Sequence, residues 1–327
     1  MAEAPAAAPA ASDAEVPGPT TNKAFLFIKP HAVTDAVKAM VPTMLAEAGI
    51  NILSEGAISS EDIDAKMFID KHYYAIASKA TLLKPTELTI PAKGLAEFES
   101  KFGLTWEAAL EAGKVFNALD ACKQLELDAD AIDKVWGATK KAGNLIKFGG
   151  GFYVGLIDSV EGKEPIYALN CFFMSMRNKF TAPGLSIYYY DVEWDQARLS
   201  WGDFRGQILG PTDPTTAPAT SVRGAIFAKW EELGLDHVPD TGDNGVHASA
   251  SPFEGLAERV NWLGADLAGD AFGAALVGAG IPAEKLAAWS VDPVVPYADG
   301  GKGSLFDALE DMDAEPCLKK AVALAAL

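Results

Sequence analysis

The alternation of apolar and polar residues predicts the structure of the first part of the chain. A short apolar run at 24–28 is typical of a buried strand. Residues 35–48 carry apolar side chains at three- and four-residue spacing, which predicts an amphipathic helix. Residues 50–58 have strand character, and residues 60–74 predict a second helix. The chain therefore opens with a β-α-β-α pattern.

The pattern changes to alanine-rich helical segments between about 89 and 151. Two apolar runs at 152–157 and 166–169, separated by a polar turn, predict a β-hairpin. We interpret residues 89–169 as an inserted subdomain that is mainly helical with one hairpin. Its triple glycine at 149–151 lacks the spacing of a phosphate-binding loop, so a turn is the favoured interpretation.

The remaining segments divide the chain into further units. Residues 172–179 predict a short helix, 185–192 a strand and 201–209 a helix that Gly210-Pro211 ends. Two blocks, 23–88 and 170–263, are predicted to form one domain around the insertion. The tail, residues 1–22, is rich in alanine and proline, and we expect it to be disordered rather than a targeting signal. Residues 264–327 are predicted to form a helical extension.

Charge and cysteine content exclude several classes of function. The formal net charge of −18 disfavours binding to nucleic acid and to anionic membranes, although local cations can still hold a small phosphorylated ligand. The three cysteines are far apart and indicate neither a disulfide framework nor a zinc site, so we expect a reducing, cytoplasmic setting. The longest apolar runs are too short to cross a membrane.

Among the four histidines, His247 has the surroundings of a nucleophile. A helix start follows it, with Ser251 as N-cap and Glu254 completing a capping box. Glu258 lies about two turns inside that helix and can face back toward the imidazole, which would orient it and keep one ring nitrogen free. The exposed N–H groups of the helix suit an arriving phosphate. The alternative is an ordinary turn ahead of a surface helix.

Cations for a phosphate occur on three separate segments. Lys29 follows the first strand, Arg205 lies on the helix before the proline-rich turn, and Arg223 follows that turn. Lysine supplies a point charge and arginine a bidentate fork for phosphate oxygens. Thr212 and Asn244 add neutral donors for phosphate or ribose.

Together these motifs resemble those of the nucleoside diphosphate kinases. The spacings from Thr212 to Arg223, from Asn244 to His247 and from His247 to Glu258 and Trp262 are similar to the family's. The motifs that carry the resemblance are Lys29-Pro30-His31-Ala32-Val33, His72-Tyr73, Phe172-Phe173, Leu209-Gly210-Pro211-Thr212-Asp213-Pro214, Ser221-Val222-Arg223-Gly224 and Asn244-Gly245-Val246-His247-Ala248-Ser249.

The resemblance implies an α/β (α+β) fold, a ferredoxin-like sandwich around a four-stranded antiparallel sheet. It implies transfer of the γ-phosphate of a nucleoside triphosphate to a nucleoside diphosphate through a phosphohistidine at His247, with Glu258 and Ser249 orienting the ring. The cofactor would be Mg²⁺ held through the nucleotide phosphates, without a metal site of the protein's own. Phe172 and Met176 would sandwich the base. The phosphates and ribose would contact Lys29, Tyr73, Arg205, Thr212, Arg223 and Asn244.

The sequence also departs from the family pattern. His31 stands where the family has Asp, Ala250 replaces another Asp, and Arg205 lies one residue further from Thr212 than expected. These departures leave two alternatives open: a catalytically weakened scaffold or assembly module, and a regulatory nucleotide-binding module without phosphotransfer. The insertion and the extension are candidate surfaces for a protein partner, and a homo-oligomer is compatible with the sequence.

Overall fold

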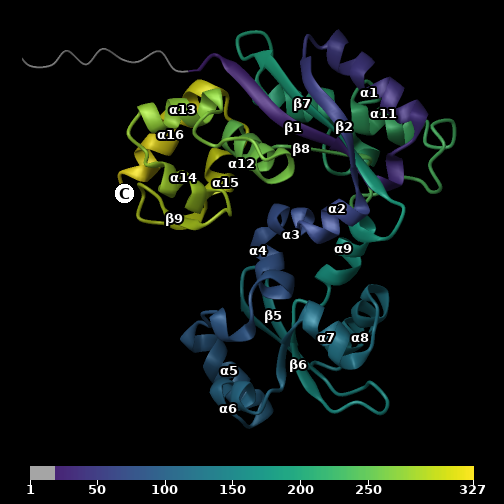
Figure 1. Cartoon of the computed structure of the whole chain (residues 1–327), viewed down its shortest axis with the longest axis vertical. Helices are drawn as coiled ribbons and strands as arrows, with labels where there is room; N and C mark the ends of the chain where they lie inside the picture. Colours follow the sequence, from purple (N-terminus) through teal and green to yellow (C-terminus); the bar gives the residue numbers. More distant parts are fainter. Residues whose placement is uncertain (1–18) are drawn as a thin grey trace, which may run out of the picture.

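The main body of the computed structural model, which describes residues 19–327, is a four-stranded antiparallel sheet with helices on both faces (Figure 1). The strand order is β2-β7-β1-β8. The predicted mixed α/β fold with an antiparallel sheet is confirmed. The strands are β1 (Thr21–Ile28), β2 (Asn51–Ser59), β7 (Ser186–Asp195) and β8 (Val246–Ala248).

Strand β1 is almost wholly buried because both faces of the sheet are covered. Ala24, Leu26 and Ile28 pack with helices α1 (Asp35–Glu47) and α11 (Val222–Ala228). Phe25 and Phe27 point to the other face, where they join a second core that includes Trp262 of α12 (Pro252–Leu263). The alternation of side chains along a strand thus explains the continuous apolar run in the sequence.

The single helix expected over 60–74 is wrong in detail. The chain forms α2 (Ser60–Ala65), α3 (Phe68–His72) and α4 (Tyr74–Ala77), followed by a π-helical turn η2 (Ser78–Leu82). Met67 has a φ of 55°, a left-handed conformation that interrupts the helical hydrogen bonds between α2 and α3. Tyr73, at the next break, has non-helical backbone angles.

The insertion contains a second four-stranded sheet, so the expectation of a mainly helical subdomain with one hairpin needs correction. The predicted hairpin is confirmed as β5 (Phe152–Ile157) and β6 (Ile166–Leu169), but β4 (Leu145–Gly149) pairs with β5, and β3 (Val115–Asn117) runs parallel to β6. These added strands are too short for an alternation pattern to stand out. The other elements are η3 (Pro85–Glu87), α5 (Ala92–Phe102), α6 (Trp106–Glu111), α7 (Ala118–Leu125) and α8 (Ala129–Lys141).

The chain after the insertion returns to the main body. Between β7 and β8 lie two helical turns that continue into one another, the second of them π-helical. The elements of this part are α9 (Phe173–Thr181), α10 (Trp201–Asp203), η4 (Phe204–Leu209) and η5 (Pro214–Thr216), while η1 (Pro30–Ala32) directly follows β1.

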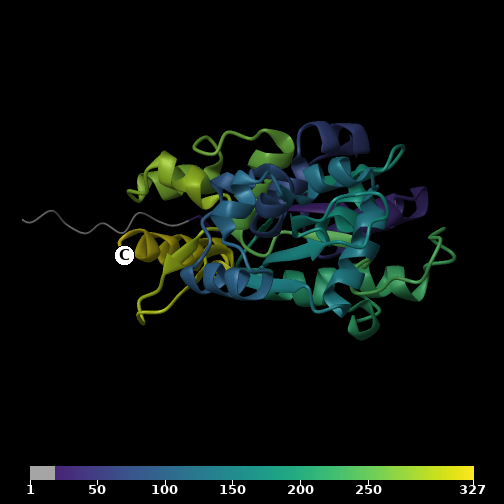
Figure 2. The same cartoon turned by 90° about the horizontal axis from the view of Figure 1, so that it is seen from below.

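The extension has a separate apolar core, to which Phe253 and Leu256 of α12 also contribute. It also carries a two-stranded sheet, which the sequence pattern does not predict. Asp313 attaches it to the body by accepting hydrogen bonds from Asn22 and from the backbone N–H of Trp201, both at 2.7 Å. Seen from below, the extension projects to one side of the body (Figure 2). Its elements are α13 (Ala271–Gly278), α14 (Ala283–Trp289), β9 (Val294–Pro296), β10 (Lys302–Ser304), α15 (Leu305–Leu309) and α16 (Ala314–Ala325).

Most of the predicted tail, residues 1–18, lies outside the described residues. Its last two positions, Thr21 and Asn22, belong to β1, so the strand begins earlier than expected. Within residues 19–327, no helix has the length and apolar character needed to traverse a bilayer.

Candidate functional site

A cavity of about 590 Å³ opens at the ends of β1 and β8. Segments that are far apart in the sequence converge on it, and they bring most of the predicted nucleotide-binding residues together. The predicted residues that line it are Lys29, Tyr73, Met176, Arg205, Thr212, Arg223, Asn244 and His247.

His247 is held by the sheet and by a carboxylate. It lies in β8 opposite Phe27 of β1, and the two rings stack with centroids 4.8 Å apart. Its Nε2 lies 2.6 Å from Oε1 of Glu258. A carboxylate at this distance accepts a hydrogen bond from the Nε2–H group, so the ring keeps its proton on Nε2 and its lone pair on Nδ1. The imidazole is therefore held in one orientation, with a lone pair on Nδ1.

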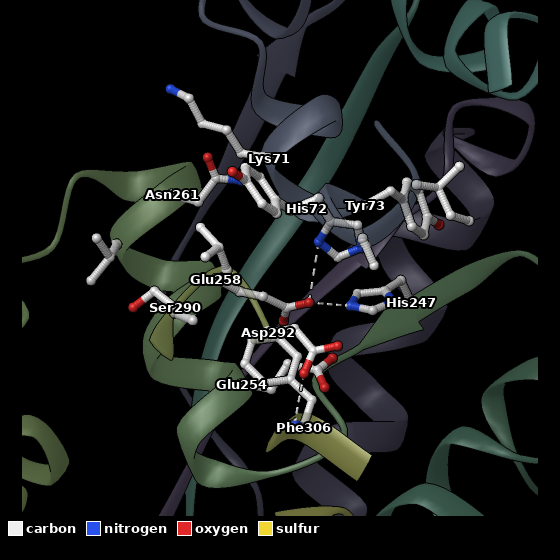
Figure 3. Close-up of a pocket in the computed structure, with 16 residues that line it drawn as sticks. Lys71, His72, Tyr73, His247, Glu254, Glu258, Asn261, Ser290, Asp292 and Phe306 are labelled. Carbon is white, nitrogen blue, oxygen red and sulfur yellow. Dashed lines mark hydrogen bonds and ion pairs between the residues drawn. The ribbon is translucent and has the colours of Figure 1, made fainter. Parts of the chain in front are cut away.

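The carboxylate of Glu258 is itself fixed from several sides. Ser249 donates its hydroxyl to Oε2 and in turn accepts from the N–H of Phe25. Nδ1 of His72 lies 3.3 Å from Oε1, but it accepts from Nε1 of Trp262 and so does not hold the carboxylate. Burial raises the pKa of Glu258 to about 7, whereas His72 and the Ser249 hydroxyl oppose that rise. Figure 3 shows the carboxylate between the two imidazole rings.

Positive charge surrounds His247 and keeps it neutral. Burial, followed by the charges of Lys29, Arg223 and Arg205, holds the pKa of His247 well below its ordinary value. Burial lowers the pKa of Lys29 to about 8, with a further contribution from Arg223. A bound anion would relieve this crowding of cations, so the electrostatics favour a phosphorylated ligand.

Arg223 donates hydrogen bonds to two separate segments that line the cavity. Its Nη1 donates to the carbonyl of Gly210 at 2.7 Å, and its Nη2 donates to the carbonyl of Val246 at 3.0 Å. The guanidinium has five N–H groups, so these contacts and a longer one from Nε to Val246 leave donors for a phosphate. Burial lowers the pKa of Arg223 to about 10, and it remains charged at neutral pH.

The one-residue displacement of Arg205 coincides with a π-helical turn. Residues Phe204–Leu209 form this turn, which holds an extra residue relative to an α-helix, and Arg205 lines the cavity. Its guanidinium is already paired: Nη1 lies 2.7 Å from both Glu310 and Asp311 of the extension. We call these two carboxylates the acidic pair.

His31 makes a contact with the loop that precedes β8. Nε2 of His31 accepts a hydrogen bond from the N–H of Gly245 at 3.1 Å. Burial lowers the pKa of His31 to about 4, so the ring is a neutral acceptor at physiological pH. Gly245 has a φ of +89°, and a Cβ there would lie 2.7 Å from Ile226, so only glycine fits this turn.

Asn244 offers a buried acceptor without a partner. Its Nδ2 donates to the carbonyl of Thr212 at 2.9 Å, while Oδ1 has no hydrogen bond within residues 19–327, although the side chain is only 2 % exposed. Buried polar atoms are seldom unpaired, and this one lies on a residue that lines the cavity. A ligand hydroxyl would satisfy it.

The structure does not bring Phe172 to the cavity. This side chain packs in the core of the insertion, where its ring lies 6.1 Å from that of Tyr153 and 6.5 Å from that of Trp136. The predicted sandwich of a base between Phe172 and Met176 therefore lacks one side, because the insertion supplies closer apolar partners for Phe172.

Several residues near the site were not assigned a role from the sequence. Glu254, interpreted as a capping residue, lines the cavity, and burial together with the charge of Glu258 raises its pKa well above the ordinary value. His72 was seen only as part of a motif with Tyr73. The acidic pair was assigned no role. The capping box placed Glu254 close to His247 in the sequence, but no local pattern links His72 or the acidic pair to the site, since only folding brings them there.

No protein-family model and no curated protein matches this sequence. Among solved structures, the chain is similar to the nucleoside diphosphate kinase of Encephalitozoon cuniculi, with a TM-score of 0.36, 14 % identity and coverage of 75 % of this chain and 90 % of that one. It is also similar to the NDP kinase of Pyrobaculum aerophilum, with a TM-score of 0.34, 17 % identity and coverage of 74 % of this chain and 95 % of that one. For the nucleoside diphosphate kinase of Aquifex aeolicus the TM-score is 0.32, the identity 11 % and the coverage 74 % of this chain and 94 % of that one. Similarity at this level is too low to assign a fold or a function.

Proposed function

We propose that this protein is a nucleoside diphosphate kinase that acts through a phosphohistidine at His247. One observation carries the proposal: Glu258 engages Nε2 of a neutral His247, and the ring lines a cavity that also contains Lys29, Arg223 and Arg205. A fixed imidazole with a free lone pair beside converging cations is the arrangement that phosphoryl transfer requires.

In the first half-reaction, the lone pair of His247 Nδ1 attacks the γ-phosphorus of a nucleoside triphosphate. The Nδ1–P bond forms while the bond from that phosphorus to the β,γ-bridging oxygen breaks, and this oxygen leaves on the nucleoside diphosphate. The Nε2 proton remains hydrogen-bonded to Glu258, which stabilises the positive charge that develops on the ring. Lys29 and Arg223 would stabilise the charge on the phosphoryl and leaving oxygens.

The second half-reaction reverses these steps with a different diphosphate. A terminal β-phosphate oxygen attacks the phosphohistidine, the N–P bond breaks, and the lone pair returns to Nδ1. Asn244 Oδ1 would accept a ribose hydroxyl, and Tyr73 and Thr212 would contact the phosphates. Mg²⁺ carried on the nucleotide phosphates would add charge neutralisation.

The fold supports this assignment through its connectivity. A sheet of order β2-β7-β1-β8 is the order of a ferredoxin-like sandwich once the strands of the insertion are set aside. In this arrangement the nucleophile lies on the edge strand β8, beside the central strand β1 that ends in Lys29. We propose that residues 23–88 and 170–263 form this domain and that residues 89–169 and 264–327 are additions to it.

The decisive experiment separates the two half-reactions. The protein is incubated with γ-labelled ATP and Mg²⁺, and bound label is tested for the acid lability and alkali stability of a phosphohistidine. The labelled protein is then freed of ATP and mixed with GDP, and labelled GTP is expected. Stoichiometric nucleotide binding without labelled protein would contradict the proposal and would favour a regulatory nucleotide-binding module.

The lowered pKa of Lys29 predicts a pH dependence for nucleotide binding. Lys29 loses its charge as the pH rises through about 8, so the affinity for ADP should fall above that pH by up to about tenfold per pH unit. The variant Lys29→Arg keeps its charge because arginine does not deprotonate in this range, and its affinity should not show this fall. Calorimetric titration across the pH range measures both. An equal alkaline loss in the variant would assign the effect to another group.

The acidic pair predicts that the extension weakens nucleotide binding. In the double variant Glu310→Gln/Asp311→Asn, Arg205 is released and two negative charges leave the cavity, so ADP should bind about threefold to tenfold more tightly. The matched control Glu284→Gln/Glu315→Gln removes the same charge elsewhere in the extension and should bind like the wild type. Weaker binding by the first variant would mean that the pair assists the nucleotide.

A further inference from the structure

A second cavity, of about 500 Å³, lies against the same histidine and shares Tyr73, His247 and Glu254 with the first. Its walls come from the segment Lys71–Ile76, from α12, from the loop 290–292 and from Phe306 (Figure 3). His72, Glu258 and His247 all line it. The proposed phosphoryl transfer uses no part of this space.

Three potential metal ligands meet at this cavity. Oε1 of Glu258 lies 2.6 Å from Nε2 of His247 and 3.3 Å from Nδ1 of His72. One ligand atom from each of the three residues lies within 4.8 Å of the other two. The imidazole rings stand at 83° to each other with centroids 4.6 Å apart, so their nitrogens converge on the carboxylate from different directions.

We propose that His72, His247 and Glu258 bind one zinc ion, or a transition metal of similar chemistry, and that the bound ion blocks phosphorylation of His247. The second half of this proposal rests on the function proposed above. The metal binding rests only on the geometry of the three side chains and of the cavity through which an ion would enter.

The ligand set selects the metal. Two imidazole nitrogens and one carboxylate oxygen form a set that Zn²⁺ takes in sites with an open fourth position, with bonds of about 2.0–2.2 Å. The 2.6 Å distance between Nε2 of His247 and Oε1 of Glu258 must lengthen to admit the ion. The 3.3 Å distance between Nδ1 of His72 and the same oxygen already matches the separation of two ligand atoms in a tetrahedral site with bonds of this length. Mg²⁺ prefers oxygen ligands and six-coordination, so the ion that accompanies the nucleotide would not compete for this site.

Carboxyl groups line the second cavity. Besides Glu258 these are Asp292 and Glu254, and burial together with the charge of Glu258 raises the pKa of Glu254, so a bound cation would favour loss of its proton. Among the described residues that line the cavity, Lys71 is the one lysine or arginine. Lys71 is exposed, and its charge is screened by solvent. Nδ1 of His72 accepts a long hydrogen bond from Nε1 of Trp262 at 3.4 Å, so it carries a lone pair, and the ion would have to replace this weak contact.

Metal binding would change the tautomer of His247. A neutral imidazole that coordinates through Nε2 carries its proton on Nδ1, so the proton moves from one nitrogen to the other through solvent. Nδ1 then has no lone pair with which to attack phosphorus. The ion also takes the carboxylate that orients the ring. A zinc-bound protein is therefore expected to be inactive as a phosphoryl acceptor.

The test uses Zn²⁺ with the full chain in the presence of excess Mg²⁺. Calorimetry should find one zinc ion per chain in the wild type and binding weaker by about tenfold or more in His72→Gln. The matched control is His237→Gln, which removes a half-exposed histidine near His31 and should bind zinc like the wild type. Absence of binding in the wild type, equal binding by His72→Gln, or loss of binding in His237→Gln would each overturn the proposal.

A measurement on the wild type alone guards against misfolding of the variant. With ¹⁵N-labelled histidine, NMR should find the His247 proton on Nε2 without metal and on Nδ1 with zinc, and an unchanged tautomer would overturn the proposal. Zinc should also prevent labelling of the wild type by γ-labelled ATP. In His72→Gln, zinc should reduce labelling less, when labelling with zinc is compared with labelling of the same variant without zinc. If no label appears even without zinc, the phosphotransfer proposal fails, while calorimetry and NMR still decide the metal site.

Discussion

Replacement of His247 by glutamine is expected to lower phosphoryl transfer from ATP to GDP by at least about 10³-fold, because the variant has no atom that can form the covalent intermediate. ADP affinity should change by less than about threefold, since Lys29, Arg223 and Asn244 remain in place and supply the binding contacts. Glutamine is preferred to alanine because its amide can still donate to Glu258 and fills much of the same space.

Three measurements check this expectation: steady-state transfer, acid-labile labelling and calorimetric binding of ADP. His237→Gln is the matched control, because it makes the same change at a half-exposed histidine outside the cavity. If His247→Gln is labelled as fully as the wild type, another residue accepts the phosphate and the proposed mechanism is wrong. Loss of both transfer and ADP binding would instead indicate a disrupted fold.

Arg177→Met is expected to destabilise the protein by about 3–5 kcal/mol, the largest effect on stability among the substitutions considered. Nε of Arg177 lies 2.9 Å from Oδ1 of Asp70, a carboxylate with no solvent exposure, and Nη2 lies 2.6 Å from Asp64. Thr81 donates to the same Asp70 oxygen. Removal of the arginine leaves a buried carboxylate without its cation, which costs much more than the loss of a surface ion pair.

This cluster also joins the chain on either side of the insertion. Thr81 lies before the insertion and Arg177 after it, so Asp70 connects the two ends to α3. The double variant Arg177→Met/Asp70→Leu removes both charges and should recover much of the lost stability. Chemical denaturation of the wild type, the single variants and the double variant gives the coupling energy. A loss below about 1 kcal/mol for Arg177→Met would mean that water or another cation already compensates Asp70.

The candidate site could be predicted from the sequence where its chemistry lies in short motifs. The segment from Asn244 to Ser249, the helix start at Ser251 and the position of Glu258 placed a carboxylate near His247, and the structure gives a distance of 2.6 Å. Local helix geometry sets that relation, because β8, the turn and α12 follow directly in the chain. The position of Lys29 could be predicted for a similar reason, because it directly follows a strand that the apolar run makes evident.

Other parts of the site depend on contacts that no local pattern contains. The π-helical turn at Phe204–Leu209 decides whether Arg205 reaches the cavity, and the acidic pair that holds it comes from a segment about a hundred residues later. Phe172 belongs to a motif that predicts contact with a nucleotide base, but its side chain packs into the insertion, where Trp136 and Tyr153 surround it with apolar groups. Such outcomes depend on competition between packing partners, which a motif does not report.

The sequence by itself determined the opening strand, helix and strand of the main body, the later strand at β7, the start of α12 and the position of Glu258 relative to His247. These features follow from hydrophobic periodicity, capping and spacing, all of which act over a few residues. The tertiary structure alone decided that the insertion forms a second sheet, that the acidic pair occupies Arg205, and that His72 joins Glu258 and His247 beside a second cavity. Those relations arise because hydrophobic burial brings distant segments together and so sets which charges and ring nitrogens meet.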